Sequence, residues 1–461
     1  MDPGRRPFYG RDRVLSELVQ GVLAPQPQSF SLVGPKLIGK THLLNYLSSE
    51  DGPLLSDAAA VQRPRTFQDG SRVVVTWIDC DWQDAQQDLV GWIYQNLQTH
   101  VRDHAKIALN WARVEAQSTD SRRIWQLARE LGEQGFRLVV LLDNFDRVFE
   151  NQMVNPDTVD ELRPLTLELA ILVATEQPLH DLDRELAASP LFNVMTQLFM
   201  GLVEPAAART WIGAYASDFP GVLEMVDELV VMTGMHPFLL RKLGDILVEV
   251  RQMLPGGPEL GSAHLPLLRL RLAEHGRLLF ETNWKRLQRL PARLPAAAVP
   301  SLLQRMVHGL LPLADVQLEQ TSALNWLINQ AMVTCCAVPG DSRYQLFSPL
   351  FAEFLARRLE PEPDAVVRTP SPAPSPPAID LDQFTKIEAA LLRYFQNRQN
   401  ETVSTEQLLA DVWKRPGSTN RRVQEGIRRL RQQLEAMQPP IGTIENDRGR
   451  GYRFIPAEGT R

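Results

Sequence analysis

Eight residues near the start of the chain have the types and the spacing that bind phosphate. Residues 34–41 read GPKLIGKT and fit the pattern G-x-x-x-x-G-K-[ST], after an apolar run and before leucines at helical spacing. Gly34 and Gly39 would let backbone N–H groups point at phosphate oxygens. Lys40 would reach the β- and γ-phosphates, and the Thr41 hydroxyl would ligate Mg²⁺. The alternative is a chance match in an ordinary turn, but the correct flanks favour a phosphate-binding loop.

Three later apolar runs predict the strands that would position this loop. Residues 72–80 (RVVVTWIDC), 138–142 (LVVLL) and 169–174 (LAILVA) alternate with segments of helical pattern. Such alternation is typical of a doubly wound parallel α/β sheet. Ligands bind these sheets at the carboxyl ends of the strands, so the residues that follow each run are the candidates for chemistry.

Two of these strand ends carry suitable side chains. Asp143 follows the second run, where it would hold Mg²⁺ directly or through water. The alternative is an aspartate that caps the strand in a turn, and the upstream loop favours the metal role. Thr175 and Glu176 follow the third run, where a sensor of the γ-phosphate and a simple strand end are equally good interpretations.

Composition bounds the class of protein. A chain of 461 residues is too long for one core, and three domains are expected. Two of the three cysteines, Cys335 and Cys336, are adjacent, which fits neither a disulfide framework nor a zinc site and favours a reducing cytoplasm. The N-terminus lacks the apolar core of a signal peptide. No stretch reaches the roughly 18 apolar residues of a membrane span, so we expect no membrane partner.

Charge divides the chain unevenly. The formal net charge is −6, yet residues 382–457 contain 13 Lys and Arg against 9 Asp and Glu, so the remainder carries −10. A basic end on an acidic protein predicts a partner there with negative charge, namely nucleic acid. Seven prolines mixed with Ser, Ala and Thr across residues 361–377 predict an extended, semi-rigid linker, here taken as residues 361–380.

The first part of the chain resembles the STAND class of P-loop ATPases, which are relatives of AAA+ proteins. The resemblance rests on the phosphate loop, the strand before Asp143, the lead-in at residues 8–11 (FYGR) and the segment at residues 233–240 (TGMHPFLL). It implies ATP or ADP as ligand. By resemblance, Phe8, Tyr9 and Pro237 would flank adenine, and His236 would contact a phosphate in the ADP state. His236 and Pro237 also fit a plain helix start.

One departure from that family concerns hydrolysis. Many active relatives have a second acid directly after the Walker B aspartate, whereas this chain has Asn144, which cannot take a proton. Asp146 lies two residues further on. Lys40, Asp143 and Asp146 are therefore the catalytic candidates, and slow hydrolysis suited to a switch is expected. Arg113 and Arg147 are available as arginine fingers, but nothing in the sequence assigns either.

The domain plan follows from these segments. Residues 1–205 would form the nucleotide-binding domain and residues 206–270 a helical lid. Residues 271–360 end in a helix, two short strands and a last helix, which resembles the winged helix that follows the lid in STAND and initiator-type ATPases. Its predicted helices carry few basic residues, so we interpret this middle domain as structural.

Residues 381–461 resemble the OmpR/PhoB-type winged helix-turn-helix domain. The matching landmarks are residues 406–413 (EQLLADVW), 427–431 (IRRLR) and 448–454 (RGRGYRF). An arginine-rich helix after a tight turn fits a recognition helix better than a solvated face. The candidate contacts with double-stranded DNA are Arg421, Arg428 and Arg429 for bases or phosphates, Arg431 for phosphate, and Arg448 and Arg450 on the wing for the minor groove.

Together these features predict a multidomain protein in which an ATPase switch controls a DNA reader. The expected function is that of a cytoplasmic, ATP-responsive transcriptional regulator, with homo-oligomerisation on ATP binding raising the effective concentration at repeated half-sites. Two other classes remain open. One is a DNA-dependent ATPase of initiator or transposition-regulator type, which DNA-stimulated turnover would favour. The other is an NLR-like defence sensor, which would normally carry a repeat or effector domain.

Overall fold

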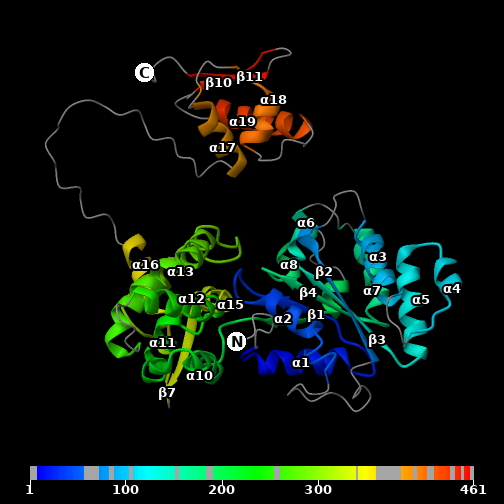
Figure 1. The fold of residues 1–461 in the computed structure, drawn as a ribbon, viewed down its shortest axis with the longest axis horizontal. Coiled ribbons are helices and arrows are strands. Elements are labelled where there is room, and N and C mark those ends of the chain that lie inside the picture. Colours follow the sequence, from blue (N-terminus) through cyan, green and yellow to red (C-terminus); the bar gives the residue numbers. More distant parts are fainter. Residues whose placement is uncertain are drawn as a thin grey trace. The chain divides into compact units, whose positions relative to one another are not determined.

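The computed structural model describes residues 8–56, 72–82, 88–102, 107–150, 154, 156–182, 190–253, 260–338, 341–359, 386–396, 398, 402–412, 420–436, 442–447 and 451–456. The chain forms two compact units, Met1–Glu362 and Pro363–Arg461 (Figure 1). The predicted linker at residues 361–380 lies outside the described residues. Within the described part, no helix is long and apolar enough to cross a membrane.

The first unit begins with a five-stranded parallel sheet in the order β2-β3-β4-β1-β5, which confirms the predicted α/β fold (Figure 1). The strands are β1 (Phe30–Val33), β2 (Val73–Asp79), β3 (Arg137–Asp143), β4 (Ala170–Thr175) and β5 (Thr196–Phe199). Every residue of β1, β3 and β4 is buried, as expected for parallel strands covered on both faces.

Helices cover both faces of this sheet because successive side chains of each strand point in opposite directions. Val139 and Leu141 of β3 pack in one core with α1 and α2, whereas Val140 and Leu142 pack in another with α3, α5 and α7. The helices of this domain are α1 (Asp12–Val22), α2 (Lys40–Ser48), α3 (Leu89–Arg102), α4 (Trp111–Glu115), α5 (Asp120–Glu133), α6 (Asp146–Glu150), α7 (Pro156–Leu165), α8 (Leu179–Leu182) and α9 (Pro190–Val194).

A mostly helical region follows within the same unit. Its helices are α10 (Pro205–Ala214), α11 (Val226–Thr233), α12 (Pro237–Met253), α13 (Leu265–Leu287), α14 (Ala298–Val307), α15 (Thr321–Asn329) and α16 (Pro349–Leu359). An antiparallel sheet, ordered β6-β8-β7, consists of β6 (Leu311–Pro312), β7 (Val333–Val338) and β8 (Asp341–Leu346). The predicted winged-helix pattern is therefore present as α15, the β7–β8 pair and α16.

The lid and the middle winged helix share one hydrophobic core. Leu229 and Leu243 of the lid helices belong to the same buried cluster as Phe280, Phe347 and Phe351. α13 runs continuously across residue 270, where the sequence suggests a domain limit. The two regions therefore pack as one body, and the domain limits stay a prediction.

The second unit has the elements of a winged helix. They are α17 (Lys386–Gln396), β9 (Thr402–Val403), α18 (Thr405–Asp411), α19 (Asn420–Ala436), β10 (Gly442–Asp447) and β11 (Gly451–Pro456), with the sheet order β10-β11-β9. Ser404 caps α18, since its hydroxyl accepts from the Gln407 N–H and the Gln407 side chain accepts from the Ser404 N–H. One face of α19 carries a buried apolar stripe: Val423, Ile427, Leu430 and Leu434.

We predict that Gly234→Ala destabilises the first unit by about 2 kcal/mol or more. Gly234 ends α11 with φ +57°, and a Cβ there would lie 2.0 Å from the Phe347 carbonyl oxygen. The matched control is Gly213→Ala in α10, where a Cβ meets nothing within 4 Å and helix propensity improves. Thermal unfolding checks both, and equal melting temperatures for the wild type and Gly234→Ala would contradict this packing.

Candidate functional site

The phosphate loop leaves β1 and ends at the first residue of α2. Gly34 lies in close packing, because a Cβ on it would be 3.1 Å from the Met200 carbonyl oxygen. Gly39 has φ +100°, a left-handed conformation that favours glycine, and a Cβ there would meet nothing within 4 Å. α2 begins without a side-chain cap, so no N-cap side chain accepts from its first N–H groups, which are the groups that bind anions at helix N-termini.

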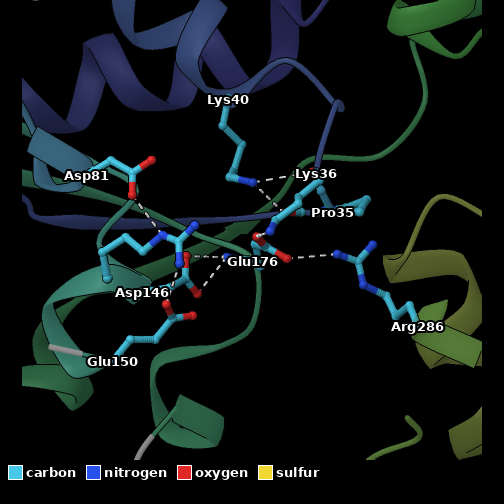
Figure 2. Close-up of polar contacts among 10 residues, drawn as sticks. Pro35, Lys36, Lys40, Asp81, Asp146, Glu150, Glu176 and Arg286 are labelled. Atoms are coloured by element: carbon cyan, nitrogen blue, oxygen red, sulfur yellow. Dashed lines mark hydrogen bonds and ion pairs between the residues drawn. The ribbon is translucent and has the colours of Figure 1, made fainter. Parts of the chain in front are cut away.

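Lys40 lies buried beneath this loop. Its Nζ donates to the Gly34 carbonyl oxygen at 2.6 Å and lies 3.3 Å from that of Pro35 (Figure 2). Burial lowers the pKa of Lys40, while the carboxylates of Glu176, Asp146 and Asp143 act in the opposite direction. The ammonium group is thus held by backbone oxygens at the mouth of the loop, where it could exchange them for phosphate oxygens.

Asp143 lies at the end of β3 beside Thr41, as the sequence predicts for a metal site. Its side chain is fully buried, and burial raises its pKa, while hydrogen bonds from the Thr41 hydroxyl and the Asn144 N–H lower it. Among the described residues, Asp143 Oδ2 has no hydrogen-bond partner. A carboxylate oxygen and a hydroxyl are hard ligands, so these residues fit Mg²⁺, which is usually completed by phosphate oxygens and water.

Asn144 directly follows Asp143 and is turned toward β2. It has φ +52°, and its Nδ2 donates to Asp79 Oδ1 at 2.8 Å. The register of β2 with β3 places Asp79 directly beside Asp143. Asp79 was missed as a site residue, although it is the last residue but one of the predicted strand at residues 72–80 and the last residue of β2. A strand end at the ligand edge is the signal that could have identified it.

Asp146 connects the ends of two strands. Both of its carboxylate oxygens accept from the Glu176 N–H, each at 2.9 Å, so the start of α6 is tied to the end of β4. Burial raises the pKa of Asp146 to about 6, against the lowering effect of the Glu176 N–H. This geometry gives Asp146 a positioning role, and its catalytic role stays a prediction.

Thr175 and Glu176 lie directly against the phosphate loop. The Thr175 carbonyl oxygen accepts from the Gly34 N–H at 3.0 Å, and its buried hydroxyl has no partner among the described residues. Glu176 forms ion pairs with Lys36 of the loop at 3.1 Å and with Arg286 of α13 at 2.9 Å (Figure 2). Arg286 was missed because it stands about 110 residues away in a helix of unremarkable pattern.

The aromatic lead-in contacts two different helices. Phe8 stacks on Tyr46 of α2 with ring centroids 4.6 Å apart, whereas Tyr9 stacks on Trp211 of α10 at 5.3 Å. The two rings of the lead-in therefore pack against different helices, one of the nucleotide-binding domain and one of the helical region. Their contact with adenine, like that of Pro237 at the start of α12, stays a prediction.

His236 is a buried, neutral helix cap. Its side chain is 1% exposed, and Nδ1 accepts from the Phe238 N–H at 3.2 Å. Burial, followed by the nearby charge of Arg11, lowers the pKa of His236 to about 3. The interpretation of His236 and Pro237 as a helix start is confirmed, and a phosphate contact by His236 stays a prediction.

Arg11 ties the lead-in to the phosphate loop. Its guanidinium donates to the carbonyl oxygens of Leu202 at 3.0 Å and Ile38 at 3.2 Å, and its N–H donates to the Glu204 carboxylate at 2.9 Å. Burial lowers its pKa to about 10, opposed by Glu204. The sequence showed Arg11 only as part of the lead-in, since nothing local indicates that an arginine will be buried.

The candidate DNA contacts are only partly described. Arg428 and Arg429 are exposed on α19. Arg431 donates from Nε to the Ile444 carbonyl oxygen at 2.8 Å, and its guanidinium lies over the Tyr452 ring. Arg431 therefore braces α19 against the β10–β11 pair, and its phosphate contact stays a prediction. Arg421 lies in α19 with its side chain outside the described set, as are Arg448 and Arg450.

Comparison with known structures gives matches at low identity. A Walker-type ATPase of Pyrococcus abyssi is 17% identical, over 76% of this chain and 98% of that one, with a TM-score of 0.45. The ORC2 protein of Aeropyrum pernix, in ADPNP–ADP complexes, is 12% identical over 78% and 95%, with a TM-score of 0.45. The ORC1 protein of the same organism, in complex with DNA, is 16% identical over 77% and 97%, with a TM-score of 0.35.

Comparison with sequence families concerns the other end of the chain. No curated protein matches the sequence. The family described as "Transcriptional regulatory protein, C terminal" matches residues 382–454, which include the described winged helix except for the last two residues of β11. The chain thus joins a P-loop α/β fold in its first unit to an OmpR/PhoB-type winged-helix domain in its second.

Proposed function

We propose that this protein is an ATP-responsive transcriptional regulator, in which a P-loop nucleotide switch controls the winged-helix domain that binds double-stranded DNA. The observation that carries the proposal is the meeting of Lys40, Thr41 and Asp143 at one edge of the sheet, in a chain that also contains a transcriptional regulatory domain. The partner classes follow from charge: nucleoside phosphate at the first unit and DNA at the second.

The residues of the first unit have separate tasks in this proposal. The uncapped N-terminus of α2 and Lys40 would bind the phosphates, while Thr41 and Asp143 would hold Mg²⁺. Bound Mg²⁺ would neutralise charge between the β- and γ-phosphates. Asn144 has no proton-accepting carboxylate and is bonded to Asp79, so hydrolysis would be slow. A slow ATPase holds each nucleotide state long enough to serve as a signal.

In the second unit, α19 would lie in the major groove. Arg428 and Arg429 would contact bases or phosphates, and Arg448 and Arg450 of the wing would approach the minor groove. ATP binding would change how these domains engage DNA, with homo-oligomers bound at repeated half-sites. A reducing cytoplasm suits a chain whose described cysteines are all free.

We expect Lys40→Ala to weaken binding of ATP at least about tenfold, equivalent to about 1.4 kcal/mol, because the buried ammonium group would be lost from the phosphate site. The matched control is Lys242→Ala on α12, whose ammonium pairs with Asp245 away from the loop. Isothermal titration with ATP and Mg²⁺ measures both. Unchanged affinity in a folded Lys40→Ala variant would refute the phosphate-loop assignment.

If the substituted arginine reads a base, Arg428→Ala and Arg429→Ala should each weaken DNA binding by about 1–3 kcal/mol. If it contacts phosphate, each should instead lower the slope of log binding constant against log salt concentration by about one. Arg393→Ala on α17 removes the same charge from an exposed site elsewhere in the domain and should have little effect. Fluorescence anisotropy at several salt concentrations separates these outcomes. Wild-type affinity for DNA in both α19 variants would show that α19 is not the recognition helix.

Coupling between the units has its own test. Gel shifts on genomic fragments would compare the full chain in ADP, in a non-hydrolysable ATP analogue and without nucleotide. The proposal predicts a different affinity or complex size with the triphosphate. Lys40→Ala should abolish that difference while retaining basal DNA binding. Identical wild-type binding in all three conditions would mean that the nucleotide site does not control the winged helix.

A further inference from the structure

Glu176 links two cations that come from different parts of the first unit. Its Oε1 lies 3.1 Å from Lys36 Nζ in the phosphate loop, and its Oε2 lies 2.9 Å from Arg286 Nη2 in α13 (Figure 2). We refer to Lys36, Glu176 and Arg286 together as the Glu176 bridge. It is a direct ionic connection between the phosphate loop and the helix that carries the lid and middle domain.

Arg286 is unusually enclosed for a residue that, among the described residues, forms an ion pair with Glu176 alone. Its side chain is 17% exposed, and its Nη1 is buried without a hydrogen-bond partner within the described chain. Neighbouring residues of α13, among them Phe280 and Leu287, belong to the core of the lid and middle domain. A buried guanidinium has a large desolvation cost and needs anionic partners, so the orphaned Nη1 marks an incompletely satisfied anion site.

The same position is next to the place where a terminal phosphate would lie. Glu176 follows Thr175, whose carbonyl oxygen bonds to the first residue of the phosphate loop. Among charged groups, Glu176 has the largest effect on the pKa of Lys40. Its carboxylate is therefore an anion held among the cations of the loop, where a γ-phosphate would compete with it.

We propose that Glu176 is an internal competitor of the γ-phosphate and that Arg286 responds to the exchange between them. The proposal rests on the nucleotide binding proposed above. With a diphosphate bound, the Glu176 bridge persists and holds α13 against the loop. With a triphosphate bound, Lys36 and Arg286 transfer to the γ-phosphate, whose greater charge and several oxygens satisfy both Nη1 and Nη2 of the guanidinium. The last turn of α13 then takes a new position.

Through this exchange, the position of the middle winged helix would depend on whether a diphosphate or a triphosphate is bound. A ligand shifts a conformational equilibrium only through different affinities for the two states. The γ-phosphate supplies that difference here, because it alone competes with the Glu176 carboxylate. α13 passes the change directly into the shared core, since Phe280 contacts the rings of Phe347 and Phe351.

A second ion pair provides the matched control. Arg293, just beyond α13, pairs with Asp181 of α8 at 2.5 Å. This pair also joins the region after α13 to the nucleotide-binding domain, but its arginine is more exposed than Arg286 and it includes no phosphate-loop residue. Arg293→Met therefore removes an interdomain ion pair without changing the cations around Glu176.

The test measures the affinities of the full-length protein for a fluorescent ADP and a fluorescent non-hydrolysable ATP analogue, both with Mg²⁺. Glu176→Gln should strengthen triphosphate binding about tenfold, and Arg286→Met should weaken it about tenfold, with ADP affinity changed less than about threefold in each. Arg286→Lys, which keeps the charge, should restore part of the loss. Arg293→Met should leave the ratio of the two affinities at its wild-type value.

Hydrogen exchange of residues 280–287 supplies a second readout that a merely structural ion pair would not alter. In the wild type, the triphosphate analogue should change exchange there relative to ADP, and Glu176→Gln with ADP should already resemble the triphosphate state. Equal ratios of triphosphate to ADP affinity in the wild type, Glu176→Gln and Arg286→Met would overturn the proposed exchange at Glu176. The proposed function would still stand in that case if nucleotide binding depends on Lys40. Failure of the wild type to bind either nucleotide would overturn both.

Discussion

Parallel pairing of β1 with β4 is the constraint on which the site depends. The register aligns Val33 with Thr175, so the phosphate loop leaves the sheet beside the last residue of β4, and the Gly34 N–H bonds to the Thr175 carbonyl oxygen at 3.0 Å. The register of β2 with β3 aligns Asp79 with Asp143 at the same edge of the sheet. Side chains that are far apart in sequence meet there because all carboxyl ends of parallel strands lie together.

Burial at that edge makes the charges interdependent. Lys40, Asp143 and Asp146 are removed from water, and burial shifts the pKa of each toward its uncharged form. Each is held by neighbours instead: Lys40 by loop carbonyls, Asp146 by a backbone N–H, and Asp143 by Thr41 and Asn144. Within the part of the chain that the structure describes, Asp143 Oδ2 and Arg286 Nη1 have no hydrogen-bond partner. Asp143 Oδ2 is suited to a cation and Arg286 Nη1 to an anion, and a metal–nucleotide complex contains both.

The sequence predicted those parts of the fold that depend on local pattern. The runs before Asp143 and Thr175 are fully buried strands, because a parallel strand covered on both faces must be apolar throughout. β5 was missed, since Thr196–Phe199 is an edge strand of only four residues, of which one is buried. Arg11, Asp79 and Arg286 were missed for another reason. Their roles depend on burial and on partners up to 193 residues away, which no local periodicity can reveal.

α13 converts this local chemistry into a longer-range connection. Its last turn presents Arg286 to Glu176, and its interior face packs in the core shared by the lid and the middle winged helix. A helix that is packed on one side and held by an ion pair at its end can occupy two discrete positions. Tightly packed cores repack between discrete arrangements rather than bend continuously. The Arg286 guanidinium then has two alternative anionic partners, the Glu176 carboxylate and the γ-phosphate. An ion pair of modest net stability suits that choice, because a stronger one would not yield to the γ-phosphate.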